Sequence, residues 1–294
     1  LLASSAASDV YKRQIFNGLG NQMSQYAYYL AKKKVNPNTK VIFDIMSKHN
    51  HYGYDLERAF GIEVNKTLLI KVLQIIYVLS RKFRLFKSVG VRTIYEPLNY
   101  DYTPLLMQKG PWGINYYVGG WHSEKNFMNV PDEVKKAFMF REQPNEDRFN
   151  EWLQVIRGDN SSVSVHIRRG DYMNIEPTGY YQLNGVATLD YYHEAIDYIR
   201  QYVDTPHFYV FSNDLDWCKE QFGVENFFYI ECNQGVNSWR DMYLMSECHY
   251  HINANSTFSW WGAWLCKFED SITVCPERFI RTVSYTHLTL PTKL

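Results

Sequence analysis

The chain has 294 residues, of which 46% are hydrophobic and 17% aromatic, enough for one large or two medium globular domains. Its 31 Lys and Arg residues balance 31 Asp and Glu residues, which excludes a general positive field for non-specific binding of nucleic acid. The five cysteines show no CxxC spacing, which indicates reduced thiols in a cytosol rather than a disulfide framework or a zinc site.

The two ends of the chain differ from the sequence between them. Residues 1–14 have neither the charged start nor the apolar core of a signal peptide, and residues 283–294 lack the aromatic pattern that precedes them. Both resemble translated adapter sequence, so we treat them as non-native and exclude them from the predicted fold. On this interpretation only Ile15 and Phe16 remain of a first strand before the glycine turn at 18–20.

The first half of the chain predicts a parallel α/β unit. A helix is expected over 22–34, where a basic last turn suits the negative end of the helix dipole. A strand is expected over 40–45, which completes the order of turn, helix and strand typical of a parallel sheet. A strand over 115–121 and a helix over 131–140 follow, and the polar segment 141–152 is expected to approach a domain boundary.

The segment 66–87 is apolar at helical spacing and carries six basic residues and no acidic one. The chain has no run of about 18 apolar residues, so we expect no membrane span. Two interpretations of 66–87 remain. It is either a helix on the surface of an anionic membrane or a helix packed on its own domain with a solvated basic face. We favour the second.

The second half alternates strands and helices more regularly. Strands are expected at 162–167, 207–212, 226–230 and 249–254, and helices at 189–202, 214–222, 238–248 and 258–266. This alternation predicts a doubly wound parallel sheet. Ligands bind beyond the carboxyl ends of the strands in such sheets, and three polar segments fall at that edge: 168–169, 213–216 and 255–257.

Arg168 and Arg169 directly follow the first of these strands. A guanidinium presents a planar fork of donors that matches a phosphate, so two of them at a strand end would hold a diphosphate and stabilise its charge as a bond to it breaks. The alternatives are a surface cluster of salt bridges and an Arg-Gly-Asp adhesion loop. The arginine pair alone does not decide among them.

The segment 255-NSTFSWWGAW-264 is expected to open a helix after another strand. Hydroxyls and unpaired N–H groups at a helix N-terminus favour an anion, although simple N-capping by Ser256 or Thr257 is the commoner use of these residues. The three tryptophans of the segment are expected to pack in the core rather than to form a sugar platform.

Two features raise the alternative of a metal site. Asp214 and Asp216 are suited to Mg²⁺ or Mn²⁺, but Asp at a helix start is also a routine cap, and an arginine clamp makes a metal redundant. His249 and His251 alternate on one strand without a third ligand. We therefore predict no metal and no cofactor.

The glycine turn 17-NGLGNQ-22 lacks the Lys-Ser/Thr of a phosphate-binding P-loop. Its backbone can still approach a ligand closely, because glycine has no Cβ.

Four motifs in order resemble the bacterial α-1,2-fucosyltransferases of glycosyltransferase family 11. They stand at 17-NGLGNQMSQYA-27, 166-HIRRGDY-172, 211-FSND-214 and 255-NSTFSWWGAWL-265. The similarity runs from about Phe16 to Phe279, which is nearly all of the chain between the two unusual ends. The chain departs from the family pattern at three positions: Asn17, Ser24 and Asn213.

The resemblance implies a GT-B fold, in which two Rossmann-like α/β domains face each other across a cleft with their parallel sheets. We assign an acceptor-side domain to 15–150 and a GDP-fucose-binding domain to 151–282. The implied reaction is inverting transfer of L-fucose from GDP-β-L-fucose to the 2-hydroxyl of a terminal galactose on a glycan or polysaccharide precursor. The alternatives are a GDP-sugar transferase of another linkage and a non-catalytic protein that binds a glycan or nucleotide sugar.

The resemblance also assigns the donor site. Arg168 corresponds to the arginine on the β-phosphate, with Arg169 beside it, and His166 corresponds to a residue of the nucleotide pocket. Asp241 resembles the aspartate that reads the N1–H and N2–H edge of guanine. The diphosphate would be lined by three residues: Ser256, Thr257 and Phe258.

The acceptor side is implied less completely. Three residues of the glycine turn would face the cleft and help seat the acceptor: Gly20, Asn21 and Gln22. Asp171 either deprotonates the acceptor hydroxyl or orients one of the arginines, and both interpretations stay open. We expect a soluble cytoplasmic enzyme, peripheral to the inner face of the membrane if 66–87 makes that contact.

Overall fold

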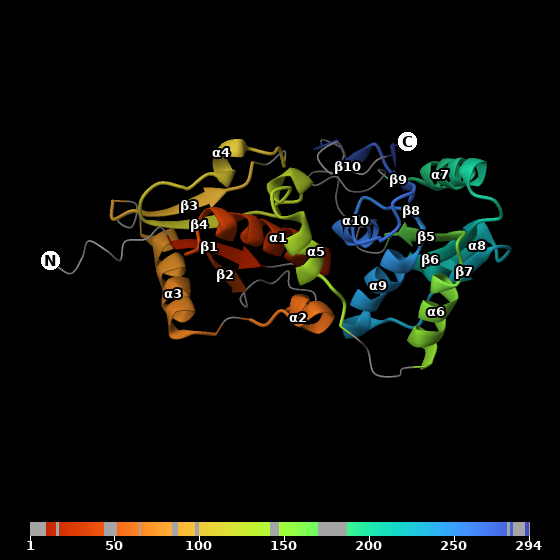
Figure 1. Cartoon of the computed structure of the whole chain (residues 1–294), viewed down its shortest axis with the longest axis horizontal. Helices are drawn as coiled ribbons and strands as arrows, with labels where there is room; N and C mark the ends of the chain where they lie inside the picture. Colours follow the sequence, from red (N-terminus) through yellow and green to blue (C-terminus); the bar gives the residue numbers. More distant parts are fainter. Residues whose placement is uncertain are drawn as a thin grey trace. The chain divides into compact units, whose positions relative to one another are not determined.

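The computed structural model describes residues 10–15, 18–43, 52–64, 66–83, 88–97, 100–141, 147–169, 187–280, 283–284 and 292–293. The chain forms two compact units, Leu1–Arg141 and Glu142–Leu294 (Figure 1). The predicted boundary between 150 and 151 falls inside α6 (Asp147–Arg157), the first helix of the second unit. The polar segment predicted there also carries Phe149, and this side chain packs in the core of the second unit with Leu153 and Ile156.

The first unit is built on a parallel four-stranded sheet in the order β2-β1-β4-β3. Its strands are β1 (Val10–Ile15), β2 (Lys40–Phe43), β3 (Val91–Tyr95) and β4 (Ile114–Val118). Its helices are α1 (Leu19–Val35), α2 (Asp55–Phe60), α3 (Leu68–Lys82), α4 (Pro104–Met107) and α5 (Pro131–Ala137), with a short 3₁₀ helix η2 (Glu124–Asn126). The helices predicted over 22–34 and 131–140 are confirmed, and β3 is a strand that the sequence analysis missed.

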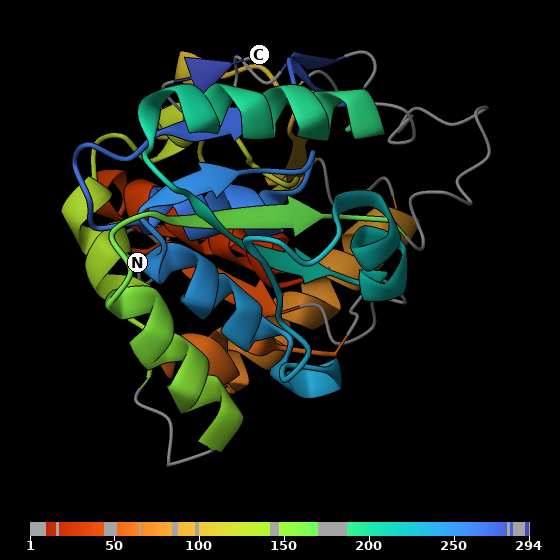
Figure 2. The same ribbon diagram turned by 90° about the vertical axis from the view of Figure 1, so that its right-hand side faces the viewer.

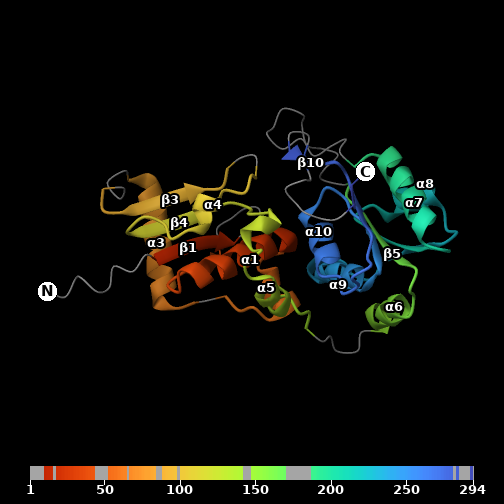
Figure 3. The ribbon, with the colours of Figure 1, turned by 45° about the horizontal axis from the view of Figure 1, so that its top comes forward.

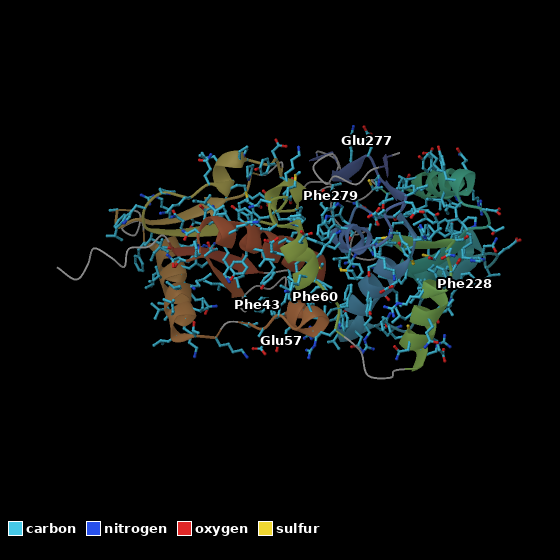
Figure 4. All side chains as sticks on the ribbon, viewed as in Figure 1. Phe43, Glu57, Phe60, Phe228, Glu277 and Phe279 are labelled. Carbon is cyan, nitrogen blue, oxygen red and sulfur yellow. The ribbon has the colours of Figure 1, made fainter. Side chains whose placement is uncertain are left out.

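Adjacent residues of β4 face opposite sides of this sheet, as alternation along a strand requires. Tyr117 packs with Tyr28 of α1, whereas Tyr116 packs with Leu73 of α3. The helices α1 and α5 lie side by side (Figures 1 and 3). Phe60 of α2, labelled in Figure 4, has its ring 5.1 Å from that of Phe138 just beyond α5. Aromatic contacts therefore join the helices of this unit to one another and to the sheet.

Strand β1 corrects the prediction for the N-terminal end. Residues 10–14, which we excluded from the fold, pair with β2 on one side and with β4 on the other. Sheet pairing uses main-chain groups that nearly all residues share, so an unusual composition is a poor guide to it. Short pieces of 283–294 pair as well, since β11 (Val283–Ser284) joins β10 (Arg278–Ile280) and β12 (Thr292–Lys293) joins β9 (Thr273–Cys275).

The second unit contains a parallel six-stranded sheet in the order β12-β9-β8-β5-β6-β7. Its other strands are β5 (Ser162–Ile167), β6 (His207–Ser212), β7 (Phe227–Tyr229) and β8 (Tyr250–Ile252). Its other helices are α7 (Leu189–Tyr202), α8 (Leu215–Phe222), α9 (Trp239–Glu247) and α10 (Thr257–Trp264), with a 3₁₀ helix η4 (Gly235–Asn237). The doubly wound sheet predicted from the alternation is therefore confirmed.

Helices cover both faces of this sheet (Figure 2). Val163, Val165 and Ile167 of β5 form one core with α7, and Tyr209 and Phe211 of β6 form another with α6 and α9. The remaining side chains of β5, Ser162, Ser164 and His166, are buried and polar. The central strand thus has an apolar face and a polar face. Among the helices that the structure describes, none has the length and apolar character needed to cross a bilayer.

Candidate functional site

The direction of strand addition reverses between β5 and β8. After β5 the sheet grows through β6 to β7, and after β8 it grows the other way through β9 to β12. Ligands bind in parallel sheets at this switch point, beyond the carboxyl ends of the two central strands. Arg168 and Arg169 follow β5, and 253–256 follow β8. Two of the predicted motifs therefore meet where this topology places a ligand.

The two arginines have different surroundings. The Nε of Arg169 donates a hydrogen bond of 3.0 Å to Oδ2 of Asp214, and its guanidinium carbon lies 3.8 Å from the ring centroid of Trp217. Its main-chain N–H donates to Oδ1 of Asn213 at 2.9 Å. Arg169 thus ties the end of β5 to the start of α8. The carboxylate and the indole hold the Arg169 side chain beside α8, and the direct donor contact of Arg169 stays a prediction.

Arg168 lies two positions after His166, on the side of the strand that carries the polar residues. The side chain of Arg168 is half-buried, with its Nε enclosed. Burial, and secondly the charge of Arg168, lower the pKa of His166 to about 3. His166 is therefore neutral near neutral pH, and Arg168 is the positive side chain that acts on it.

His166 connects this strand to α10. Its ring lies 5.7 Å from the ring of Phe258, and its Nδ1 is buried with no hydrogen-bond partner among the residues that the structure describes. The Tyr192 hydroxyl fixes the main chain here by donating a 3.1 Å hydrogen bond to the His166 carbonyl. The structure thus brings together three predicted donor-site residues: His166, Arg168 and Phe258.

The start of α10 is capped by Ser256. Its hydroxyl accepts a hydrogen bond of 3.3 Å from the Phe258 N–H, and Thr257 is the first helical residue. The capping interpretation is therefore confirmed for Ser256, because its oxygen is used within the helix. Trp260 and Trp261 are buried, which confirms that these tryptophans are core residues.

Asp241 lies in the first turn of α9. Because α9 follows β7 in a parallel sheet, this turn lies at the same edge as the arginine. Asn233 Nδ2 donates a hydrogen bond of 2.8 Å to Oδ1 of Asp241. Burial raises the pKa of Asp241 to about 7, and the hydrogen bond from Asn233 opposes the rise. A carboxyl group at this position is divided between its charged and neutral forms near neutral pH.

Asn253, directly after β8, is a candidate that the sequence analysis missed. Since Val165 pairs with Ile252 in the ladder, the next residues along the two strands are His166 and Asn253. Asn253 is fully buried, and neither atom of its amide has a partner within the described part of the chain. A buried amide without hydrogen bonds is costly. The signal was present in the sequence as 251-HINAN-255, a polar alternation at a buried strand end.

Replacing Asn253 with alanine should weaken the binding of GDP about tenfold, because a bound donor can supply the hydrogen bonds that the amide lacks. The stability of the ligand-free protein should change by less than about 1 kcal/mol, since no hydrogen bond is lost. Thermal unfolding with a GDP titration measures both quantities.

The matched control is Asn115→Ala on β4, where Nδ2 donates to the Pro111 carbonyl at 2.7 Å. That variant should lose about 1 to 3 kcal/mol of stability and keep its GDP affinity. Equal GDP affinity in Asn253→Ala and the unchanged protein would contradict a role for Asn253 in the donor site.

The residues predicted to seat the acceptor lie at the start of α1. Gln22 is fully buried; its Nε2 donates to the Gly53 carbonyl at 2.8 Å, and its Oε1 accepts from the Asp55 N–H at 2.9 Å. The prediction that Gln22 faces a cleft is therefore wrong, because its amide joins α1 to the chain before α2. Gly20 is buried, and Asn21 is half-buried. Asp171 lies outside the described residues.

Both oxygens of the Asp214 carboxylate accept hydrogen bonds within the protein. One oxygen caps α8 by accepting from the Trp217 N–H at 3.4 Å, and the other accepts from Arg169. The capping interpretation is thus confirmed. His249 and His251 have separate partners, Asp270 at 2.8 Å and Ser164 at 2.8 Å. Over the ranges that the structure describes, no group of three or more His, Cys, Asp or Glu side chains is placed to hold a metal ion.

Known proteins resemble the chain over most of its length. It is 33% identical to an alpha-1,2-colitosyltransferase of Escherichia coli, with 90% of each chain covered. It is 29% identical to the O-antigen biosynthesis glycosyltransferase WbnK of Escherichia coli, covering 93% of this chain and 96% of the relative. A galactoside alpha-(1,2)-fucosyltransferase 1 of Ateles belzebuth is 26% identical over 84% of this chain and 62% of its own length. The model of Glycosyl transferase family 11 matches residues 3–282, and the chain belongs to that family.

Proposed function

We propose that the chain transfers L-fucose, with inversion, from GDP-β-L-fucose to the 2-hydroxyl of a terminal galactose on a glycan or polysaccharide precursor. The observation that carries this proposal is the group formed by Arg168, His166 and Phe258 at the switch point of the second sheet. A single guanidinium beside a neutral imidazole suits a diphosphate leaving group. The names of the relatives support an α-1,2 linkage and a galactoside acceptor.

The roles of the surrounding residues follow from their positions. Asp241 binds the N1–H and N2–H edge of guanine, since a carboxylate accepts two hydrogen bonds. Thr257 and Phe258 line the diphosphate at the start of α10. The reaction needs no metal, because Arg168 supplies the positive charge that the departing diphosphate requires. Asp171 either deprotonates the acceptor hydroxyl or orients Arg168.

A second donor has specific support. The colitosyltransferase of Escherichia coli is 33% identical to this chain, and colitose is fucose without its 3-hydroxyl. GDP is the leaving group in both donors, so Arg168 and the guanine contact of Asp241 would serve either donor. The two candidates therefore differ only in the residues that surround the sugar.

The cell compartment follows from the substrate. GDP-sugars are made in the cytoplasm, so we propose that the enzyme works there, at the inner face of the membrane where surface-glycan precursors are assembled.

The test is acceptor-dependent release of GDP from GDP-fucose and from GDP-colitose, with lactose as the acceptor and EDTA present. We expect GDP release with at least one donor and a product linked to the 2-hydroxyl of galactose, as determined by NMR. Activity that disappears with EDTA and returns with Mg²⁺ or Mn²⁺ would contradict the metal-free reaction. A folded protein that transfers to no member of a β-galactoside panel would contradict the galactose acceptor.

A further inference from the structure

The outward face of α3 is apolar. Six of its aliphatic side chains are between 37% and 76% exposed: Leu68, Leu69, Val72, Ile75, Val78 and Leu79. Phe83, directly after the helix, is 55% exposed. A helix that faces water is normally polar on that side, and contiguous exposed apolar patches mark interaction surfaces. This face of α3 is therefore suited to an environment other than water.

The helix cannot turn to bury this face. Its inner side is fixed to the first sheet by Ile70 and Leu73, which are 3% and 4% exposed and pack with Tyr116. The Tyr116 hydroxyl donates a hydrogen bond of 2.7 Å to the Leu73 carbonyl. Gln74 Nε2 donates to the Phe43 carbonyl of β2 at 3.3 Å. The outward orientation of the apolar face is thus a result of the fold, and α3 forms one flank of the first unit (Figure 1).

The charges around this face have one sign. The segment 66–87 carries six basic residues and no acidic one. Lys71 is exposed and stands three positions after Leu68 and four before Ile75, which places it beside both on the helix surface. Lys66 precedes the helix, and Arg81 in its last turn lies with its guanidinium carbon 5.8 Å from the Tyr77 ring centroid. An apolar face bordered by basic side chains is complementary to a surface that is both apolar and anionic.

This combination favours a lipid bilayer over a second copy of the chain. Two copies that meet through α3 would bring basic side chains together, and 66–87 has no acidic residue to neutralise them. An anionic bilayer offers phosphate groups to the lysines and arginines and an acyl boundary to the aliphatic side chains. The helix is also too short to span the membrane, so it would lie along the surface.

We propose that α3 is a membrane-docking surface, in which Leu68, Val72 and Ile75 enter the headgroup boundary of an anionic bilayer and Lys66 and Lys71 contact lipid phosphates. We expected the exposed side of this helix to be a basic face in water. It is instead an apolar face with basic side chains beside it. One consequence rests on the proposed function: docking concentrates the enzyme where lipid-anchored acceptors are found.

The experiment measures co-sedimentation of the full chain with phosphatidylcholine vesicles that either contain or lack phosphatidylglycerol. We expect binding to the anionic vesicles, and weaker binding as salt screens the charges. Val72→Glu should reduce the partition coefficient at least about tenfold, because it places a negative charge on the apolar face. Lys71→Glu should reduce it more than about fivefold, since one basic residue near an anionic surface contributes about that factor.

Matched substitutions control for charge and for folding. Val224→Glu changes a valine in the second unit that is 80% exposed, against 43% for Val72, and Lys136→Glu changes an exposed lysine on α5. Both controls should bind the anionic vesicles as the unchanged protein does. The melting temperatures of all four variants should lie within a few degrees of that of the unchanged protein, because each position is on the surface.

Three results would overturn the proposal. They are no binding to the anionic vesicles, equal loss of binding in Val72→Glu and Val224→Glu, and a dimer in solution that Val72→Glu separates. The assay contains neither donor nor acceptor. Vesicle binding without transfer to any member of the β-galactoside panel would therefore count against the proposed function alone, and transfer to one of them without vesicle binding would count against the docking surface alone.

Discussion

Replacing Arg168 with alanine should lower the turnover of GDP-fucose at least about a hundredfold, a loss of about 2.7 kcal/mol in transition-state stabilisation. Arg168 is the positive side chain at the switch point, and the neighbouring imidazole of His166 is neutral because burial and the arginine lower its pKa to about 3. Arg169, the other positive side chain that follows β5 within the described residues, is paired with Asp214. The measurement is the initial rate of GDP release at saturating donor and acceptor.

Arg169→Ala is the matched control for this prediction. The side chain of Arg169 is held by Asp214 and lies on Trp217, so its removal should lower the melting temperature through a lost ion pair and cation–π contact. Its effect on kcat should be much smaller than that of Arg168→Ala. Equal losses of kcat in the two variants would show that the arginines act as a pair, contrary to the roles that the structure gives them.

Asp241→Asn should raise the KM for GDP-fucose about tenfold to a hundredfold, because it removes a charged acceptor from two guanine donors. The pKa of Asp241 is raised to about 7 by burial. In the unchanged protein, guanine must therefore bind the charged minority of molecules below pH 7. As the pH falls below 7, the KM should rise about tenfold for each pH unit. Above pH 7 the KM should be constant. The Asn variant should show no such rise between pH 5.5 and 7.

Asp241→Asn should weaken donor binding but stabilise the folded protein at high pH. A carboxyl whose pKa is raised from 3.8 in the unfolded chain to about 7 in the folded one binds its proton more tightly when folded. Its contribution to stability is therefore lost as the pH rises through that range. Asp241→Asn should consequently raise the melting temperature at pH 8 relative to the unchanged protein. A flat KM profile in the unchanged protein, or a lower melting temperature for the variant at pH 8, would contradict this assignment.

The second unit was largely predictable because its signals are local. The run 162-SVSVHI-167 is β5 with the same bounds, and 189–202 is α7. The four predicted strands of this sheet alternate with helices that the sequence displays, whereas β9 and β12 were missed. Parallel alternation then places the carboxyl ends of the strands at one edge, which is why the segments 168–169, 213–216 and 255–257 could be assigned to it. Phe258 and Asp241 were assigned by the resemblance to the family.

The errors arose where a non-local contact decides the role of a residue. Gln22 belongs to a motif, but its amide binds Gly53 and Asp55, more than thirty positions away in the chain. Arg169 is adjacent to Arg168, yet Asp214 and Trp217 hold its side chain in another direction. Strand β1 depends on two neighbours that no local composition reveals. The sequence alone does not specify such partners.

Because β5 and β8 are neighbours in the sheet, the proposed donor site forms only when the second unit is completely folded. The two strands supply His166 and Arg168 on one side and the start of α10 on the other, and the contact between Ser164 and His251 joins positions 87 residues apart. The complete site cannot exist in a partly folded chain that has formed only β5, β6 and β7. A nucleotide that binds this site must therefore recognise only the finished sheet, and by mass action it would stabilise that state by about 2.7 kcal/mol at a hundred times its Kd. In a cell, the supply of GDP-sugar would then set the fraction of chains that persist as folded enzyme.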